Sequence, residues 1–115
     1  MDVKIRRSLY LSLVHRRSQL LMNIHFSGKI WFWRGPSPFY FVTVPAEQSD
    51  ELHHISGSVT YGWGMIPVTA RIGQTEWQTS LWPKDGGYIV PIKVSVRQAE
   101  KLEEGDEVVI QLEVA

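Results

Sequence analysis

Residues 88–114, YIVPIKVSVRQAEKLEEGDEVVIQLEV, decide the fold of this chain. The pattern predicts a strand over 88–92, a short helix over about 96–102, a turn at Gly105-Asp106 and a second strand over 107–114. Apolar residues alternate with polar ones along the second strand, so one of its faces lies against a core. The residues of that face are Val108, Ile110, Leu112 and Val114.

The helix in this stretch carries its own start and stop signals. Ser95 followed three residues later by Gln98 predicts a capping box at the N-terminus of the helix. Gly105 suits the left-handed residue just past the helix end, and Asp106 can hydrogen-bond locally in the turn. The predicted apolar face of the helix consists of Val96, Ala99 and Leu102.

The chain before this stretch repeats the same order of elements. Strands are predicted over 24–33, 39–44, 66–72 and 75–82, and a helix over 46–55 that Gly57 stops. Gly28 is expected to mark a bend or bulge in the first strand. Strand, strand, helix and strand thus occur twice. The matched pairs are Trp33 with Trp82, Tyr40 with Tyr88, Val42 with Val90, Val44 with Ile92, and Leu52 with Leu102.

Each half of this repeat would leave open strand edges, and closing the two halves on one another removes those edges. We therefore predict a mainly β fold, a small and partly split β-barrel of about six strands with two short helices. It is built from two β-β-α-β halves, and the two helices cross at the ends of the barrel.

Composition sets limits on function. A length of 115 residues fits one domain, and the absence of cysteine excludes disulfides, thiolate metal ligands and a cysteine nucleophile. It also fits a reducing compartment, and we expect a cytoplasmic location. Residues 23–115 carry seven basic and eleven acidic residues, which disfavours the barrel as a general nucleic-acid binder.

Residues 1–22 differ from the rest, with five basic residues and one acidic residue. Their apolar run over 9–14 is too short to span a bilayer, and no small-residue cleavage site follows it. A basic amphipathic helix that meets a membrane surface or nucleic acid is one interpretation. The other is a poorly ordered extension, with Met22 as the real start. We predict an extension over 1–22 and a single β-barrel domain over 23–115.

A series of short motifs carries a family resemblance. The unit from Val90-Pro91 to Leu112 resembles the swapped-hairpin units of the AbrB, MazE and MraZ group. The run from Phe26 to Val114 is similar to domain of unknown function family 1905. The resemblance implies a double-split β-barrel and implies no activity. The matching motifs are Tyr61-Gly62-Trp63-Gly64, Ile66-Pro67-Val68, Thr79-Ser80-Leu81-Trp82-Pro83, Tyr88, Pro91-Ile92-Lys93, Val96-Arg97 and Gly105-Asp106.

Four residues are candidate ligand contacts: Trp63, Tyr88, Lys93 and Arg97. Trp63 lies between two glycines, so its indole could be aimed at a ligand or could plug one end of the barrel. Lys93 and Arg97 are four residues apart near the helix start, and such a basic pair could hold a carboxylate or a phosphate. Alternatively, Arg97 pairs with a carboxylate and fixes the helix. The possible partners are Asp106, Glu100, Glu103 and Glu104.

Catalytic and metal-binding patterns are weak. Asp50 and His54 share a helix face, as two metal ligands can, but no third ligand accompanies them. The chain contains the residue types of a catalytic triad in Ser80, His25 and Asp85, but no nucleophile elbow accompanies them. We therefore predict no catalytic residues, no metal site and no cofactor.

The resulting functional prediction is a soluble, non-catalytic module that binds a small anionic ligand or a protein partner. The alternative is a DNA-binding or transcription-linked protein of AbrB-like architecture, and an enzyme of unknown class is third. DNA binding is disfavoured because the aromatics alternate with core positions and are not expected to form a stacking platform. The barrel could close as a monomer or by exchange in a dimer.

Overall fold

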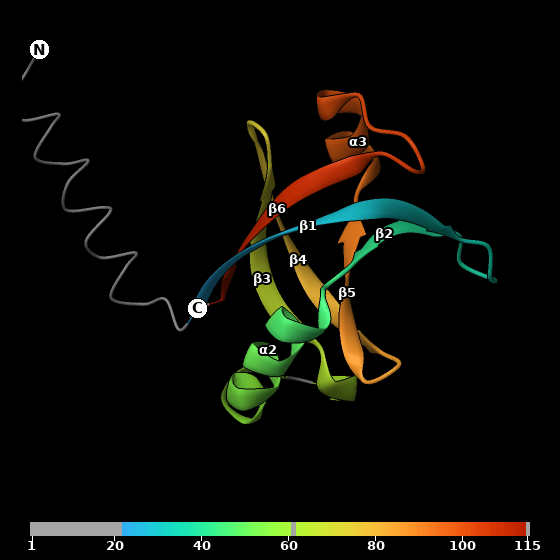
Figure 1. Cartoon of the computed structure of the whole chain (residues 1–115). Coiled ribbons are helices and arrows are strands. Elements are labelled where there is room, and N and C mark those ends of the chain that lie inside the picture. Colours follow the sequence, from blue (N-terminus) through green and yellow to red (C-terminus); the bar gives the residue numbers. More distant parts are fainter. Residues whose placement is uncertain (1–21, 61, 115) are drawn as a thin grey trace, which may run out of the picture.

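The computed structural model describes residues 22–60 and 62–114, and six antiparallel strands in that part form a closed barrel (Figure 1). Two helices and a single helical turn complete it. The strands are β1 (Met22–Trp33), β2 (Phe39–Thr43), β3 (Ile66–Ile72), β4 (Thr75–Lys84), β5 (Gly87–Ile92) and β6 (Glu107–Val114); the helical elements are α2 (Ala46–Val59), η1 (Gly62–Gly64) and α3 (Val94–Glu100).

The strand order confirms the two-fold repeat predicted from the sequence. Around the barrel the strands run β1-β2-β5-β4-β3-β6, and β1 and β6 close the ring. Exchanging β1 with β4, β2 with β5 and β3 with β6 leaves all six pairings unchanged. Val42 and Val90, which the repeat matches, lie opposite each other where β2 meets β5, and both are fully buried. The pseudo-two-fold axis therefore passes between them.

The core fills the inside of the barrel, as the period-two alternation of the strands requires. In β3 and β6 every second residue is buried. The four predicted inward residues of β6 are among them. In β5 the run from Tyr88 to Ile92 is buried on both faces. Something on the outside of the barrel must therefore cover the outer face of β5.

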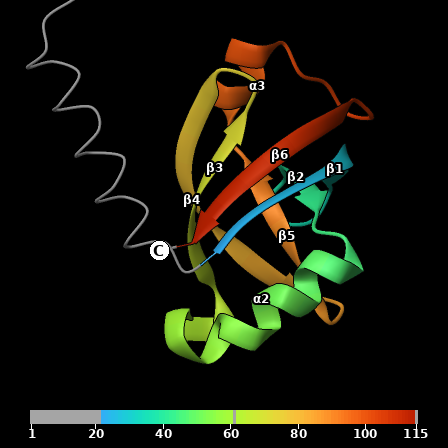
Figure 2. The same ribbon diagram turned by 60° about the vertical axis from the view of Figure 1, so that its left-hand side comes forward.

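The two helices lie at opposite ends of the barrel, as Figures 1 and 2 show. α2 is longer than predicted, because Gly57 does not stop it and the helix continues to Val59. Glycine is only weakly unfavourable inside a helix, and the Thr60 N–H still donates to the Ser56 carbonyl at 2.9 Å. Leu52 is buried and Ile55 packs against the core, so these two residues form the apolar side of α2.

α3 begins and ends earlier than predicted. Lys93, not Ser95, is its N-cap residue, and no side chain caps the helix, so the expected capping box is wrong. The left-handed residue that ends the helix is Lys101, and the Leu102 N–H donates back to the Arg97 carbonyl. Gly105 has a positive φ in the following turn, not at the helix end.

Two details of the turn and of β1 complete the comparison. The Asp106 carboxylate accepts a hydrogen bond from the Glu103 N–H at 2.8 Å, which confirms its predicted local role. The register of β1 with β6 runs without interruption through Gly28, so the bulge expected there is absent. A Cβ at Gly28 would instead lie 2.8 Å from Val42 Cγ1. Close approach of two strands, not a bulge, requires this glycine.

The predicted extension over 1–22 lies outside the described residues except for Met22, which is the first residue of β1. Within residues 22–60 and 62–114, no helix is long and apolar enough to cross a membrane.

Candidate functional site

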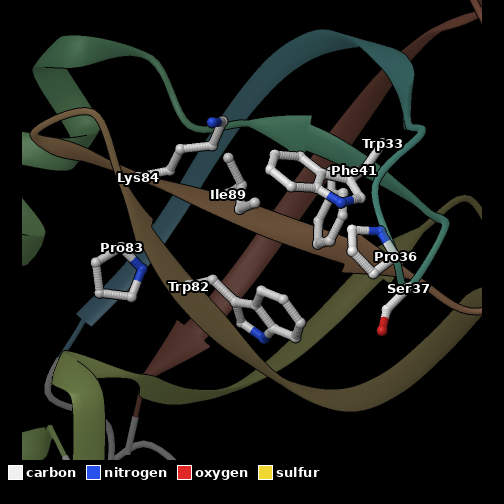
Figure 3. Close-up of a pocket in the computed structure, with 8 residues that line it drawn as sticks. All are labelled: Trp33, Pro36, Ser37, Phe41, Trp82, Pro83, Lys84 and Ile89. Carbon is white, nitrogen blue, oxygen red and sulfur yellow. The ribbon is translucent and has the colours of Figure 1, made fainter.

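An apolar groove of about 440 Å³ lies on the outside of the barrel where β2, β5 and β4 meet (Figure 3). We call it the aromatic groove. Its floor is formed by Phe41 and Ile89, which point outward from β2 and β5. The residues that line it are Trp33, Pro36, Ser37, Phe41, Trp82, Pro83, Lys84 and Ile89.

Aromatic rings gather around Phe41 on the outer face of β2. The ring of Phe41 lies 5.3 Å from Trp31, 5.7 Å from Phe39 and 5.4 Å from Trp82, measured between ring centroids. These tilted arrangements are the ones aromatic pairs prefer. The expectation that the aromatics would not form a platform is therefore wrong, because one set faces outward and gathers around Phe41.

Trp33 and Trp82 are the exposed parts of this surface. Their exposed fractions are 39% and 44%, although both side chains are large and apolar. In the described part of the chain neither indole N–H has a hydrogen-bond partner. The indoles of Trp31 and Trp77 do, since they donate to Thr43 Oγ1 at 3.0 Å and to the Pro91 carbonyl at 3.3 Å. Trp33 and Trp82 therefore offer part of their ring surface to a ligand, together with indole N–H groups that have no partner among the described residues.

Lys84 marks the end of the aromatic groove nearest to α2. Its Nζ lies 5.0 Å from the centroid of the Trp33 ring and 3.4 Å from Asp85 Oδ2. The β4–β5 hairpin holds it there, because Lys84 pairs with Gly87 across a two-residue turn. Asp85 and Gly86 both have positive φ, as a type I′ turn requires.

A second hollow of about 300 Å³ continues beyond Lys84, and we call it the polar depression. Lys84 and Ile89 line both hollows, so the two lie next to each other on the surface. Asp50 from the first turns of α2 and Asp85 from the hairpin bring carboxylates to the depression. Its full lining is Thr43, Val44, Ala46, Ser49, Asp50, Lys84, Asp85, Gly86, Gly87 and Ile89.

Of the four residues predicted as ligand contacts, Trp63 is the most exposed. Its exposed fraction is 95%, so the interpretation that it plugs the barrel is wrong. Its backbone has φ 67°, a left-handed conformation that a non-glycine residue rarely adopts. Trp63 does not line the aromatic groove, although a Cβ at its neighbour Gly64 would lie 3.3 Å from Pro83 Cγ.

Tyr88 is buried and ties β5 to α2. The His53 Nε2 donates to the Gly86 carbonyl at 2.9 Å, and its Nδ1 lies within hydrogen-bond distance of the Tyr88 hydroxyl, at 3.3 Å. Burial raises the pKa of the Tyr88 phenol, and its contact with the Ser56 side chain opposes that rise. Tyr88 is thus placed in the core and not in a groove.

Lys93 and Arg97 lie at the other end of β5, where Lys93 is the N-cap residue of α3 and Arg97 is within the helix. Lys93 is exposed, whereas the guanidinium of Arg97 covers the Tyr40 ring, with 3.8 Å between Cζ and the ring centroid. Arg97 Nε is buried without a hydrogen-bond partner. The expected ion pair of Arg97 with a nearby carboxylate is therefore wrong for the described residues, because stacking on Tyr40 takes its place.

The structure thus does not bring Tyr88 together with Lys93 and Arg97, since β5 separates them. Sequence reasoning missed the aromatic groove, although it matched Trp33 with Trp82 as repeat partners. The signal was the outward set of large aromatics at 31, 33, 39 and 41 in the first hairpin. The side chain of His54 is engaged with the backbone, since its Nδ1 lies 2.7 Å from the Asp50 carbonyl. Within residues 22–60 and 62–114, no three potential ligands gather as a metal site would require.

Comparison with known proteins gives one family match. A family model described as "Domain of unknown function (DUF1905)" matches residues 26–112. No curated protein matches the chain significantly. The likeness to the AbrB, MazE and MraZ group stays a prediction.

Proposed function

Because the chain belongs to the DUF1905 family, whose description names no activity, we propose its function from its surface: it is a non-catalytic module that binds a protein partner in the aromatic groove. The observation that carries this proposal is the pair of half-exposed tryptophans, Trp33 and Trp82, over a buried apolar floor. Tryptophan is enriched among the residues that dominate binding energy at protein interfaces.

The area that remains exposed is large enough to matter. Covering the exposed part of one indole removes on the order of 100 Å² from water, which stabilises a complex by about 2 kcal/mol. Two such indoles, one from each half of the repeat, supply the centre of an interface. The floor beneath them is already packed, so little order has to be created on binding.

The charges in the groove favour a protein over a small anion. Lys84 is the cation among the lining residues, and its ammonium is already 3.4 Å from the Asp85 carboxylate. A small anion would have to compete with that carboxylate. A single cation also gives little support to DNA, because duplex binding rests on many phosphate contacts. The lining contains no nucleophile with an adjacent base, so it does not support an enzyme.

The proposal is tested by selecting short peptides from a random display library on the folded domain. Selected peptides are expected to lose at least tenfold in affinity for Trp82→Ala and to keep their affinity for Trp63→Ala. Trp63 is the matched control, since it is a more exposed tryptophan outside the groove.

A second variant changes the shape of the groove without removing an indole. A Cβ at Gly35 would clash with the Trp33 indole, so Gly35→Ala displaces that ring and is expected to weaken the same peptides. The proposal fails if the library yields no binder, or if the binders hold Trp82→Ala and Gly35→Ala as tightly as the unaltered domain.

A further inference from the structure

We propose that the partner presents an extended, proline-containing segment that ends in a basic residue, and that this segment runs from the aromatic groove into the polar depression. The inference rests on the proposed function and adds the chemistry of the partner. It is carried by the adjacency of the two hollows, by the ring faces and donors of the groove, and by the charges of the depression.

The shape of the site favours a long ligand. Lys84 and Ile89 belong to both hollows, so a single path leads from Trp33 and Trp82 past the β4–β5 hairpin to the start of α2. A compact ligand would fill one hollow and leave the other in water. The two tryptophan walls are also half exposed, whereas sites for small molecules bury most of the ligand surface. An extended segment contacts the protein along one of its own sides and leaves its other side in solvent.

The groove itself matches polyproline II backbone. Such a segment has three residues per turn, lacks internal hydrogen bonds and presents its carbonyls outward. Pyrrolidine rings lie flat on indole faces, and the carbonyls between them accept from indole N–H groups. Trp33 and Trp82 supply exposed ring faces, and within residues 22–60 and 62–114 their N–H groups have no other partner. Because proline fixes φ in advance, the segment also loses little entropy on binding.

The polar depression supplies the direction of the segment. Two carboxylate residues, Asp50 and Asp85, line it together with one cationic residue, Lys84. The Lys84 ammonium lies 3.4 Å from Asp85 Oδ2, so Asp50 has no cationic partner among the lining residues. A basic residue of the partner is therefore favoured in the depression. Lys84 disfavours a second basic residue next to Trp33, so the prolines must occupy the groove.

The test is a titration of the domain with the peptide acetyl-Ala-Pro-Pro-Ala-Pro-Pro-Arg-Ala-amide, followed by the indole N–H signals in NMR spectra. The signals of Trp33 and Trp82 are expected to shift. Those of Trp31 and Trp77 should stay, since their N–H groups already donate inside the protein, and that of Trp63 should stay because it lies outside the groove.

Charge variants test the direction. Asp50→Asn with Asp85→Asn is expected to weaken this peptide by about two- to fivefold, as exposed ionic contacts do. The same variant should leave the peptide with alanine in place of arginine unchanged. Glu107→Gln is the matched control, an exposed carboxylate at the start of β6. The double variant should also remove part of the salt dependence of binding.

The outcomes separate the inference from the proposed function. Equal affinity for the arginine and alanine peptides would show that the partner needs no basic residue. Equal affinity for a glycine-serine peptide with the same arginine would show that it needs no prolines. If the proline peptides leave Trp33 and Trp82 unshifted while selected peptides or benzoate shift them, the proposed class of partner is wrong and the groove still binds. If no probe shifts either signal, the groove is not a binding site and both proposals fail.

Discussion

The guanidinium of Arg97 lies over the ring of Tyr40, with Cζ 3.8 Å from the ring centroid. The contact joins α3 to β2, which are far apart in the sequence. Tyr40 in turn stacks on Phe32 at 4.7 Å, and Arg34 lies 5.2 Å from the Phe32 ring. Two cations thus enclose two aromatic rings at the α3 end of the barrel. The buried Arg97 Nε has no hydrogen bond, so the ring contact is what holds this side chain.

Replacing this cation should destabilise the domain. Arg97→Met keeps an apolar stem of similar length but removes the cation, and we expect a loss of about 1 kcal/mol in the free energy of unfolding. Tyr40→Phe keeps the ring face and should stay within about 0.5 kcal/mol of the unaltered protein. Urea denaturation of both variants is the measurement. Equal losses in both variants would show that the ring face is not the source of the stability.

Gly28 and Val42 should behave as a coupled pair. Gly28→Ala places a methyl group 2.8 Å from Val42 Cγ1, and we expect it to cost about 2 kcal/mol by overpacking. Val42→Ala also destabilises, by about 2 kcal/mol, because it leaves a cavity at a fully buried site. The double variant should recover about 1 kcal/mol or more of the sum, because the new methyl occupies the space that Val42 vacates.

The control for that cycle is Val114→Ala, which is also fully buried but lies at the far end of β6. Its cost should add to that of Gly28→Ala within about 0.5 kcal/mol. Full additivity in the Gly28 and Val42 pair, measured by the same denaturation, would contradict the close approach of these two strands.

Two glycines with open surroundings should respond to alanine in opposite directions. A Cβ at Gly57 or at Gly86 would meet nothing within 4 Å, so neither substitution causes a clash. Gly57 is inside α2, where alanine is favoured, and Gly57→Ala should stabilise the domain by about 1 kcal/mol. Gly86 has φ 79°, and Gly86→Ala should destabilise it by about 1–2 kcal/mol. Thermal unfolding measures both, and a shift of the same sign in both would refute the backbone argument.

Burial of Tyr88 predicts a loss of stability at alkaline pH. Its folded pKa is raised above the reference value of 10.0, so the folded state holds the phenol proton more tightly than the unfolded state does. The associated stability is complete below pH 10 and is lost as the pH rises through the folded pKa. Tyr88→Phe removes this dependence. The melting temperature of the unaltered protein should therefore fall relative to that of Tyr88→Phe from about pH 9 to about pH 12, and a constant difference would contradict the prediction.

The sequence pattern correctly predicted those elements whose conformation depends on neighbouring residues alone. β3 and β6 follow the alternation of Ile66 to Ile72 and of Val108 to Val114, because one face of each strand is buried. The Asp85-Gly86 turn follows from the two positive φ values that glycine and aspartate tolerate. The capping box was predicted wrongly because tertiary packing, not the local signal, decides where α3 begins. Ser95 is a good N-cap residue, but the bonds from Val96 and Arg97 to the Lys93 carbonyl start α3 two residues earlier.

The aromatic groove depends on closure, which no local pattern encodes. Trp33 ends β1 and Trp82 lies near the end of β4, and only the pairing of β2 with β5 brings these two ends to one surface. The stacking of Arg97 on Tyr40 arises in the same way from elements in different halves. Sequence reasoning could place each of these residues on its strand or helix, but it assigned Arg97 to nearby carboxylates because sequence distance was its sole guide to contact.

The pairing of Met22 with Val114 has a consequence for how the chain can be connected. The first residue of β1 lies beside the last of β6, so a short linker could join them and new ends could be opened at the Gly73-Gln74 turn. Such a circular permutant keeps all six strand pairings, because the cut falls in a turn and not in a strand. It converts the pairing of β1 with β6 into a local hairpin, and it makes the pairing of β3 with β4 join the two new chain ends. Since the two halves are equivalent in the topology, the permuted chain has the same order of elements as the natural one and is expected to fold at a similar rate into the same barrel.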